Sequence, residues 1–232
     1  MDSQHRNDEQ EATRDQSMTE PLNQQHAEDA SPVAKDSRKN NSASKEIVEW
    51  IKALAIAVVL VFIIRQFLFS PFIVDGPSMQ PNFETGERLI VNKILYQFRE
   101  PKFGEVVVFD VPEQNRKFIK RVIGVPGDRI RVEGDDLFIN DQRIEELYIE
   151  EAIEKSQANG ELYNGIGSRY NFPNDTVKET TVPEGMIFAL GDNRSNSTDS
   201  RAIGFVSEDE IVGRADVIFW PLSKMEFIKH NY

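Results

Sequence analysis

The residue with the clearest chemical potential is a serine on a sharp turn. Ser78 directly follows Gly76 and Pro77 in the stretch "GPSMQP", which Pro81 closes. Glycine permits backbone angles that other residues resist, and proline fixes φ and interrupts helices, so the stretch predicts a tight turn that presents a hydroxyl. A hydroxyl becomes a nucleophile when a neighbouring base takes its proton. The alternative is an ordinary turn serine that is hydrogen-bonded to nearby backbone.

The composition restricts which base could activate this serine. Histidine occurs only at positions 5, 26 and 230, and cysteine does not occur. The chain therefore has almost no side chains from which to build a histidine-activated serine or a zinc site of histidine or cysteine ligands. A lysine or a carboxylate is left as the base, and we expect neither a metal nor a cofactor. The lack of cysteine also excludes disulfides and thiolate nucleophiles.

Lys120 is the lysine best placed to be that base. When the apolar stretch "FIKRVIGV" is read as a strand, Phe118, Lys120 and Val122 share one face. A lysine between apolar neighbours is partly desolvated, which lowers the pKa of its ammonium group and favours a neutral amine. The alternative is a lysine that snorkels out from a strand edge.

A third polar cluster, "GDNRSNSTDSR" at residues 191–201, follows the apolar run "MIFAL". It differs from a calcium-binding EF-hand loop, because Arg194 and Ser197 stand where that loop needs a ligand and a glycine. A solvated loop is the plain alternative. The density of arginine and aspartate in so short a span instead favours a structured network of ion pairs.

The segment before Ser78 is predicted to cross a membrane. As a helix, residues 50–69 would match the thickness of a bilayer core, and their only charges, Lys52 and Arg65, lie near the two ends. We place a single transmembrane helix at residues 45–70. Basic residues before the span predict a cytoplasmic amino terminus and an extracytoplasmic domain after it. Residues 1–44 are polar, and we predict that they form a disordered cytoplasmic tail.

The remaining chain is predicted to be mainly β. Short apolar and β-branched runs separated by Gly, Pro, Asn and Asp predict strands, namely "ERLIVNK", "EVVVFD", "FIKRVIGV", "DRIRVE", "DLFIN", "MIFAL" and "ADVIFW". Residues 71–132 and 183–232 would form the β core that carries the candidate site. Residues 133–182 are polar and loop-rich, with one candidate short helix at residues 147–156, and would form a smaller inserted cap subdomain. The formal net charge of −12 argues against a nucleic-acid partner.

Four segments together resemble the type I signal peptidases, the membrane-anchored serine proteases that remove signal peptides from exported proteins. These segments are "GPSM", "GERLIVNK", "FIKRVIGVPGD" and "GDNRSNSTDSR", and the likeness runs from the predicted membrane span to about residue 220. It implies a signal-peptidase-like β fold, similar to that of self-cleaving repressors. It also implies signal peptides with small P1 and P3 residues as partners, together with the lipid bilayer of the cell membrane. Residues 67–74, "FLFSPFIV", would then keep an apolar edge against the lipid, with simple core packing as the alternative.

The resemblance also implies roles for individual residues. By position, Ser78 is similar to the family's nucleophile and Lys120 to its general base, a serine/lysine dyad. Ser197 corresponds to the family hydroxyl that helps to orient the lysine amine. Four further residues would support the site: Asp199 and Arg201 as a buried ion pair, and Asp192 and Arg121.

Position 76 points to one branch of the family. Some members carry there a serine whose hydroxyl completes the oxyanion hole, whereas this chain has Gly76. The branch found mainly in Gram-positive bacteria similarly has glycine. The oxyanion would then be held by the Ser78 backbone N–H and a second donor, for which the Gly76 N–H is a candidate.

Two other functions stay open at this point. A self-cleaving repressor is similar in using a serine/lysine dyad, but it needs a DNA-binding domain where this chain has a membrane span and an acidic tail. An inactive membrane-anchored β domain could bind peptides as an adapter, yet it would not need the catalytic positions, all of which are filled.

Overall fold

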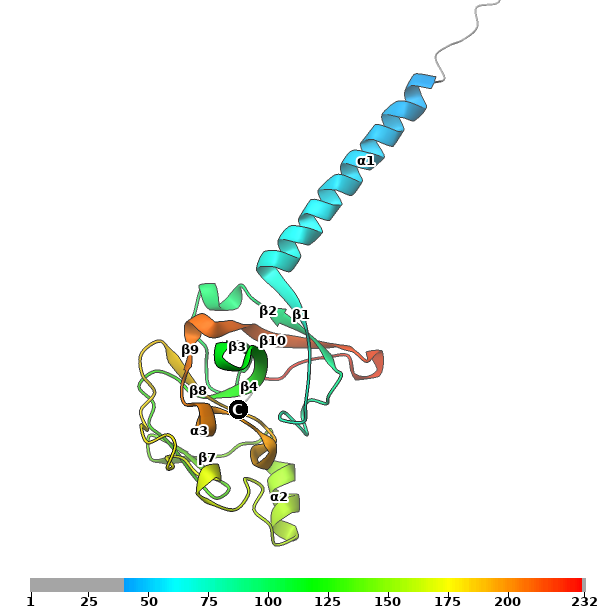
Figure 1. The fold of residues 1–232 in the computed structure, drawn as a ribbon. Helices are drawn as coiled ribbons and strands as arrows, with labels where there is room; N and C mark the ends of the chain where they lie inside the picture. Colours follow the sequence, from blue (N-terminus) through cyan, green and yellow to red (C-terminus); the bar gives the residue numbers. More distant parts are fainter. Residues whose placement is uncertain (1–39, 231–232) are drawn as a thin grey trace, which may run out of the picture. The chain divides into compact units, whose positions relative to one another are not determined.

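A computed structural model describes residues 40–230 of the chain. Helix α1, Asn40–Ile63, continues as the π-helical turn η2, Ile64–Leu68, and then as strand β1, Phe69–Ile73 (Figure 1). Ser44–Leu68 is long and apolar enough to cross a membrane, and its most apolar 18-residue window has a mean hydropathy of 2.6. Residues 1–39 of the predicted tail lie outside the described residues. Helix α1 begins at Asn40, inside the range 1–44 predicted as tail.

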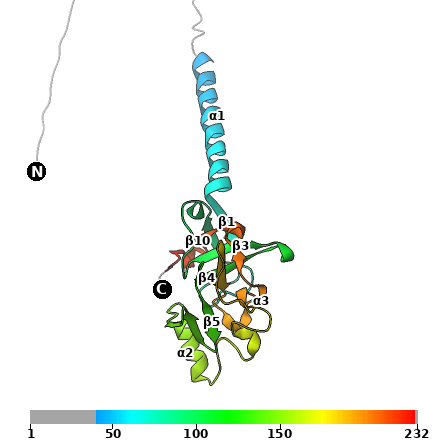
Figure 2. The same ribbon diagram turned by 90° about the vertical axis from the view of Figure 1, so that its left-hand side faces the viewer.

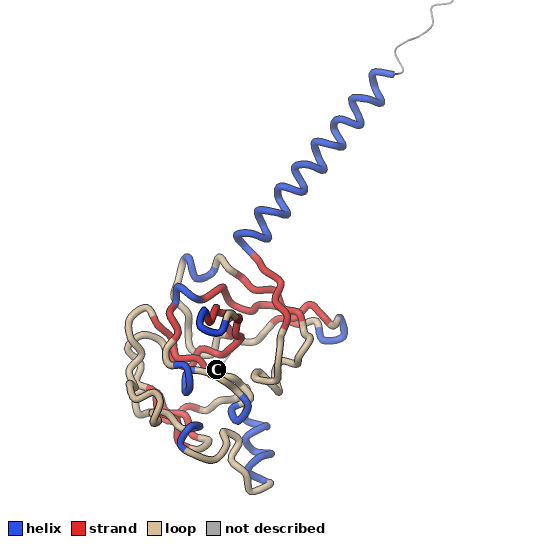
Figure 3. The backbone as a smooth tube through the Cα atoms, in the orientation of Figure 1, coloured by secondary structure: helices blue, strands red, loops and turns tan. Residues whose placement is uncertain are grey.

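Strands, and not helices, are the main regular elements after η2, and loops connect them (Figure 3). The large sheet has the order β1-β2-β10-β3-β4-β8-β9, with β11 paired to β10, and neighbouring strands are antiparallel. Besides β1, its strands are β2 Arg88–Asn92, β3 Val106–Val111, β4 Arg116–Gly124, β8 Met186–Leu190, β9 Val206–Ser207, β10 Ile211–Trp220 and β11 Glu226–Phe227. Short 3-10 turns connect them: η3 Leu95–Gln97, η4 Pro112–Gln114, η5 Ser168–Tyr170, η6 Arg194–Asn196, η7 Glu208–Glu210 and η8 Leu222–Lys224.

A second, three-stranded sheet has the order β5-β6-β7, with β5 Ile130–Glu133, β6 Asp136–Ile139 and β7 Gln142–Ile144. Helix α2, Glu150–Ala158, follows it and overlaps the predicted short helix, and both views place α2 beside this sheet (Figures 1 and 2). A further short helix, α3 Ser200–Ile203, lies in the large-sheet part of the chain. All the predicted strand runs are confirmed, and the mainly β fold class with them.

The two sheets share a hydrophobic cluster. Ile130, Val132 and Leu137 of the small sheet pack in one buried cluster with Phe188 and Leu190 of β8. The boundary predicted at residue 133 separates β5, in the predicted core, from β6, in the predicted cap, although the two strands pair. The division into a core and a cap stays a prediction.

Strand β1 lies in the stretch predicted as an apolar edge against lipid. It pairs with β2 along its length, from Phe69↔Asn92 to Ile73↔Arg88. Phe72 packs against the core, whereas Phe69 and Ile73 are 37% and 57% exposed. Core packing therefore accounts for one face of β1, while its other face is apolar and open.

Strand β4 runs between the buried clusters and carries polar residues into them. Ile119 packs in the cluster that contains Val106 and Val108, whereas Val122 packs in another cluster, with Phe118 half-buried against it. Side chains alternate along a strand, so both faces of β4 are covered. The chain thereby buries two adjacent cations, Lys120 and Arg121, at 3% and 2% exposure. Burial of this kind needs specific partners.

Candidate active site

The turn that carries Ser78 is fixed by buried residues on both sides. Val74, Met79 and Phe83 belong to one buried cluster, and the Phe83 N–H donates to the Met79 carbonyl at 3.0 Å. Gly76 has φ +93°, a left-handed conformation that suits glycine because it has no Cβ. The predicted tight turn is therefore present, and Ser78 is half-buried within it.

Lys120 reaches this turn from β4. Its Nζ lies 2.8 Å from the Ser78 Oγ, and it also donates to the Ile119 carbonyl at 2.9 Å. The Phe118 ring lies 4.9 Å from the Nζ, which confirms that Phe118 and Lys120 share a face. The structure thus joins a serine and a lysine that are 42 residues apart in the sequence.

Burial sets the protonation of this lysine. Desolvation lowers the pKa of Lys120 from 10.5 to about 8, although the negative charges of Asp199 and Asp192 act in the opposite direction. Removing the ammonium group from water disfavours its charged form. About a tenth of Lys120 is therefore neutral at pH 7, and the neutral form that a general base requires grows as the pH rises.

The 191–201 loop contributes three buried ion pairs. Arg121 Nε and Nη2 donate to the two oxygens of Asp192 at 2.9 and 2.7 Å. Arg201 holds Asp199 in the same two-pronged way, at 2.9 and 2.8 Å. Burial alone would raise the pKa of Asp199, but the charge and hydrogen bonds of Arg201, together with hydrogen bonds from Gly191 and Ser197, outweigh it and hold that pKa below its usual value. The loop is thus a structured ion-pair network, as its density of charges predicts.

The third pair involves a residue that the sequence reasoning missed. Arg194 contacts Glu146 through two nitrogens, and both side chains are almost fully buried. Arg194 Nη2 also donates to the Tyr148 hydroxyl at 3.1 Å. Glu146 and Tyr148 lie in the polar insertion, where no local pattern marks a buried carboxylate.

The same loop is bonded directly to the serine turn. The Asn193 backbone N–H donates to the Ser78 carbonyl at 3.0 Å, and the Asn193 side-chain amide donates to the Pro77 carbonyl at 3.1 Å. Gly191 is packed so closely that a Cβ there would lie 2.5 Å from the Ser78 carbonyl oxygen and 2.3 Å from the Ser197 Oγ. The loop therefore closes on the turn with no room for a larger residue.

Other predicted groups of the site do not bond as the complete site would need. Among the described residues, the buried Ser197 Oγ makes no hydrogen bond to Lys120. No backbone hydrogen bond within residues 40–230 uses the Ser78 or the Gly76 N–H. These donors are free to bind another molecule. In the same range, no group of His, Asp and Glu residues is arranged to hold a metal ion.

The comparisons with known proteins agree with this geometry. Residues 47–220 match the model of the family described as "Signal peptidase, peptidase S26". Signal peptidase IB of Staphylococcus aureus (strain COL) is 39% identical over 188 residues, which cover 81% of this chain and 95% of that protein. Signal peptidase I P of Bacillus subtilis subsp. natto is 38% identical over 192 residues, or 82% and 98% of the two chains.

A crystal structure of a signal peptidase I from Enterococcus faecalis V583 is 32% identical, covering 50% of this chain and 97% of that one, with a TM-score of 0.44. The two sequence relatives come from Gram-positive bacteria, in agreement with the branch to which Gly76 points. The family match spans the serine turn, the buried lysine and the charged loop alike. This chain belongs to the signal peptidase family, peptidase S26, and is a type I signal peptidase, a serine protease.

Proposed function

We propose that this protein is a membrane-anchored endopeptidase that removes signal peptides from exported preproteins through a Ser78/Lys120 dyad. The observation that carries the proposal is the 2.8 Å separation of the Lys120 Nζ and the Ser78 Oγ in a largely buried setting. Histidine, the more usual activator of serine, does not contact Ser78 among the described residues. The lysine is therefore the base to which the hydroxyl can give its proton.

The reaction proceeds in two halves. Neutral Lys120 takes the proton of the Ser78 hydroxyl while the Oγ attacks the P1 carbonyl carbon and forms a tetrahedral intermediate. The protonated lysine then gives that proton to the leaving amine as the peptide C–N bond breaks, which leaves an acyl-enzyme on Ser78. In the second half, Lys120 takes a proton from a water that attacks the ester, and returns it to the Oγ when the ester bond breaks.

The negative charge of the tetrahedral intermediate needs hydrogen-bond donors. The free Ser78 N–H supports its assignment as one donor, and the free Gly76 N–H supports its assignment as the second. Each donor of this kind contributes about 3 kcal/mol to transition-state stabilisation in serine proteases.

The supporting residues hold the dyad in place. Arg121 directly follows Lys120 in β4, and its ion pair with Asp192 ties that strand to the 191–201 loop. The Asp199–Arg201 pair stiffens the far end of the same loop, where Asp199 also accepts from the Gly191 N–H at 3.1 Å. Ser197, whose Oγ is buried beside Gly191, is proposed to orient the amine of Lys120 once substrate is bound.

The substrate is proposed to bind as an added strand. β3 pairs with β4 over Arg116–Arg121, whereas β8 pairs with β4 only from Arg121 to Gly124. One edge of residues 116–120, next to the dyad, is therefore without a strand partner in the described part of the chain. An extended segment can pair there and place its P1 carbonyl near Ser78, with small P1 and P3 side chains in shallow pockets.

The helix Ser44–Leu68 is proposed to be the membrane anchor, with a cytoplasmic amino terminus and the sheets outside. β1 follows the helix directly and keeps Phe69 and Ile73 exposed, which suits contact with the lipid surface. Residues 71–132 and 183–232 are proposed to be the catalytic core, and residues 133–182 the cap. Cleavage would then occur next to the bilayer in which the signal peptide is held.

The test is cleavage of a preprotein with an Ala-x-Ala site by the full-length protein in detergent, across a pH series. Wild type, Ser78→Ala and Lys120→Met are compared, with near-UV circular dichroism to show that each is folded. We expect an alkaline-rising rate for the wild type and no cleavage by either variant. An active Lys120→Met enzyme would place the base elsewhere, and an inactive wild type would favour an adapter.

A further inference from the structure

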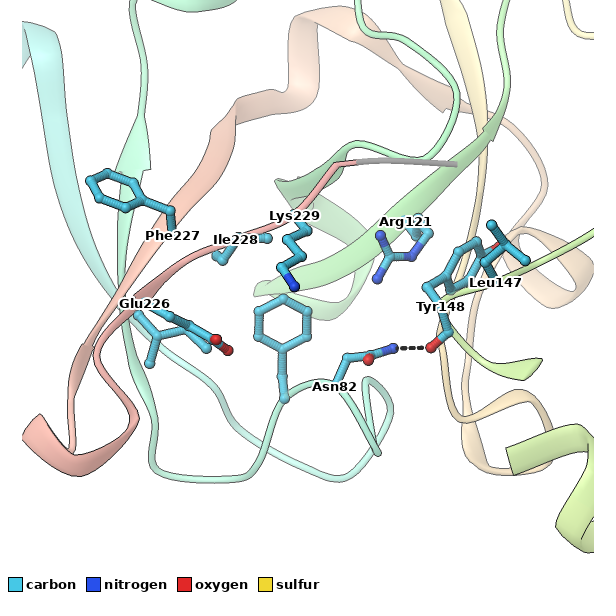
Figure 4. Close-up of a pocket in the computed structure, with 10 residues that line it drawn as sticks. Asn82, Arg121, Leu147, Tyr148, Glu226, Phe227, Ile228 and Lys229 are labelled. Atoms are coloured by element: carbon cyan, nitrogen blue, oxygen red, sulfur yellow. Dashed lines mark hydrogen bonds between the residues drawn. The ribbon is translucent and has the colours of Figure 1, made fainter. Parts of the chain in front are cut away.

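Asn82 connects three parts of the chain that are distant in sequence. Its Nδ2 donates at 2.8 Å to the backbone carbonyl of Tyr148 and at 2.8 Å to the Asp192 Oδ2. Both partners are acceptors only, so the amide nitrogen, and not the oxygen, must face them. Figure 4 shows the Asn82 side chain reaching toward Tyr148, with Arg121 close by. One side chain thus links the serine turn, the insertion and the 191–201 loop.

The link begins on the element that carries the nucleophile. Asn82 follows Ser78 by four residues, and the buried Met79 and Phe83 fix the backbone between and beyond them. A force on the Asn82 side chain is therefore transmitted to the Ser78 turn rather than absorbed by a loose loop.

The link ends beside the proposed base. Asp192 is fully buried, and its Oδ2 accepts from both Asn82 and the Arg121 Nη2. Arg121 is the next residue after Lys120 in β4. The chain of contacts from Asn82 through Asp192 to Arg121 thus runs alongside the single contact between Ser78 and Lys120.

We propose that Asn82 is a positioning residue that sets the Ser78 turn against β4, an inference that rests on the Ser78/Lys120 dyad proposed above. It touches neither reacting atom and acts through Asp192 and Arg121. Proton transfer depends steeply on the separation of donor and acceptor, so a loosened turn lowers the turnover number. Asn82 hydrogen-bonds to Tyr148 and Asp192 and not to residues 116–120 of the open edge of β4, so we expect its loss to leave substrate binding almost unchanged.

The charge of Asn82 matters as much as its hydrogen bonds. Asp192 and Asp199 are the carboxylates whose charges act on Lys120, and Arg121 and Arg201 partly neutralise them. Asparagine contacts Asp192 without adding charge. An aspartate at this position would place a second carboxylate against Asp192 and would favour the ammonium form of Lys120.

Space at the site permits both substitutions. Asn82 borders a cavity of about 410 Å³ whose walls include Phe83, Ile218 and Ile228 (Figure 4). Leucine and aspartate have the same branched shape as asparagine, and the cavity gives either side chain room to turn away from the two oxygens that the Asn82 Nδ2 contacts. Asn82→Leu removes the donor alone, and Asn82→Asp removes the donor and adds a charge.

The experiment measures kcat and KM for the Ala-x-Ala preprotein across pH with the full-length protein in detergent. The matched control is Asn140→Asp, which likewise removes an exposed amide donor to a carboxylate, that of Asp128, in the small sheet. We expect Asn82→Leu to lower kcat about tenfold with KM within about twofold. For Asn82→Asp we expect a similar loss, with the rising limb moved to higher pH by about 0.5 relative to Asn82→Leu. The control should match the wild type.

Each other outcome overturns the inference in a recognisable way. Wild-type kcat in both Asn82 variants would remove the positioning role and leave the dyad intact. A loss of kcat that disappears on cooling, together with a lowered melting temperature, would show a purely structural role. If kcat rose over the same pH range in both Asn82 variants, the connection of Asn82 to the base would be refuted. Failure of the dyad itself would show separately, as cleavage by Lys120→Met.

Discussion

Arg194 and Glu146 form an ion pair that is almost wholly removed from water, with side-chain exposures of 1% and 2%. Arg194 belongs to the 191–201 loop, whereas Glu146 precedes α2 in the insertion. Arg194 Nη1 donates to one carboxylate oxygen at 2.9 Å, and Nη2 contacts the other. This pair fastens the loop that closes on the serine turn to a part of the chain that contributes no proposed catalytic group.

Removal of one partner should destabilise the protein strongly. Glu146→Ala leaves the Arg194 charge buried and unpaired, and we expect a loss of about 3 to 5 kcal/mol in unfolding free energy. The double variant Glu146→Leu/Arg194→Met should recover most of it, because no charge is left buried. Chemical denaturation in detergent measures the difference. Arg129→Ala, which breaks the exposed pair with Asp141, is the control and should change little.

The cleavage rate should rise through the pKa of Lys120. Only the neutral amine can act as base, and the pKa of this group is about 8. Below that value, kcat/KM should increase about tenfold for each pH unit, and above it the rate should level off. The measurement is initial rate against pH with a preprotein that is itself stable over the range. A rate that does not vary between acid and alkaline pH would contradict the mechanism.

Lys120 should cost the protein stability at neutral pH. Its folded pKa of about 8 lies below the ordinary 10.5, so the unfolded chain binds more protons between these two values. The cost is therefore fully present below pH 8 and disappears as the pH rises toward 10.5. It amounts to about 3 kcal/mol.

Lys120→Met removes that cost along with the base. The gain in unfolding free energy of the variant over the wild type should be larger at pH 7 than at pH 10, by about the same 3 kcal/mol. Denaturation curves at the two pH values test this expectation. A difference in stability that does not change with pH would show that Lys120 is not desolvated in the folded protein.

Gly191→Ala should disable the enzyme without unfolding it. The new methyl group would lie 2.5 Å from the Ser78 carbonyl oxygen, so the turn or the loop must move. A displacement of about 1 Å in a catalytic group costs on the order of 100-fold in rate. Gly160→Ala is the control: a Cβ there meets no atom within 4 Å, so it adds only the backbone strain of a left-handed residue, at φ +78°, far from the serine turn in sequence. We expect the control to keep wild-type kcat/KM.

The sequence predicts the strands and the dyad, but not the contacts that fix them. Alternation in "FIKRVIGV" predicts that Lys120 shares a face with Phe118, because the two-residue period of a strand is a local property. The pairing of Arg194 with Glu146 joins residues 48 apart, and no local signal marks Glu146 among the many acidic residues around it. The contacts of Asn82 are equally impossible to predict from the sequence, because an asparagine after a proline is typical of any turn.

β1 escaped prediction for a different reason. Its residues are apolar apart from Ser70, which suits a lipid surface and a strand equally. Its pairing with β2 shows that β1 is a strand of the sheet, but leaves open whether its exposed face contacts lipid.

The strand order has a consequence for when the enzyme becomes active during its own synthesis. β10 lies between β2 and β3. It therefore joins the pair β1–β2, whose connection carries Ser78, to the pair β3–β4, which carries Lys120, through residues near position 215. A chain that stops before β10 lacks the strand that pairs with both β2 and β3. The large sheet is therefore incomplete until β10 has been synthesised, and we expect the proposed dyad to become active only after that point.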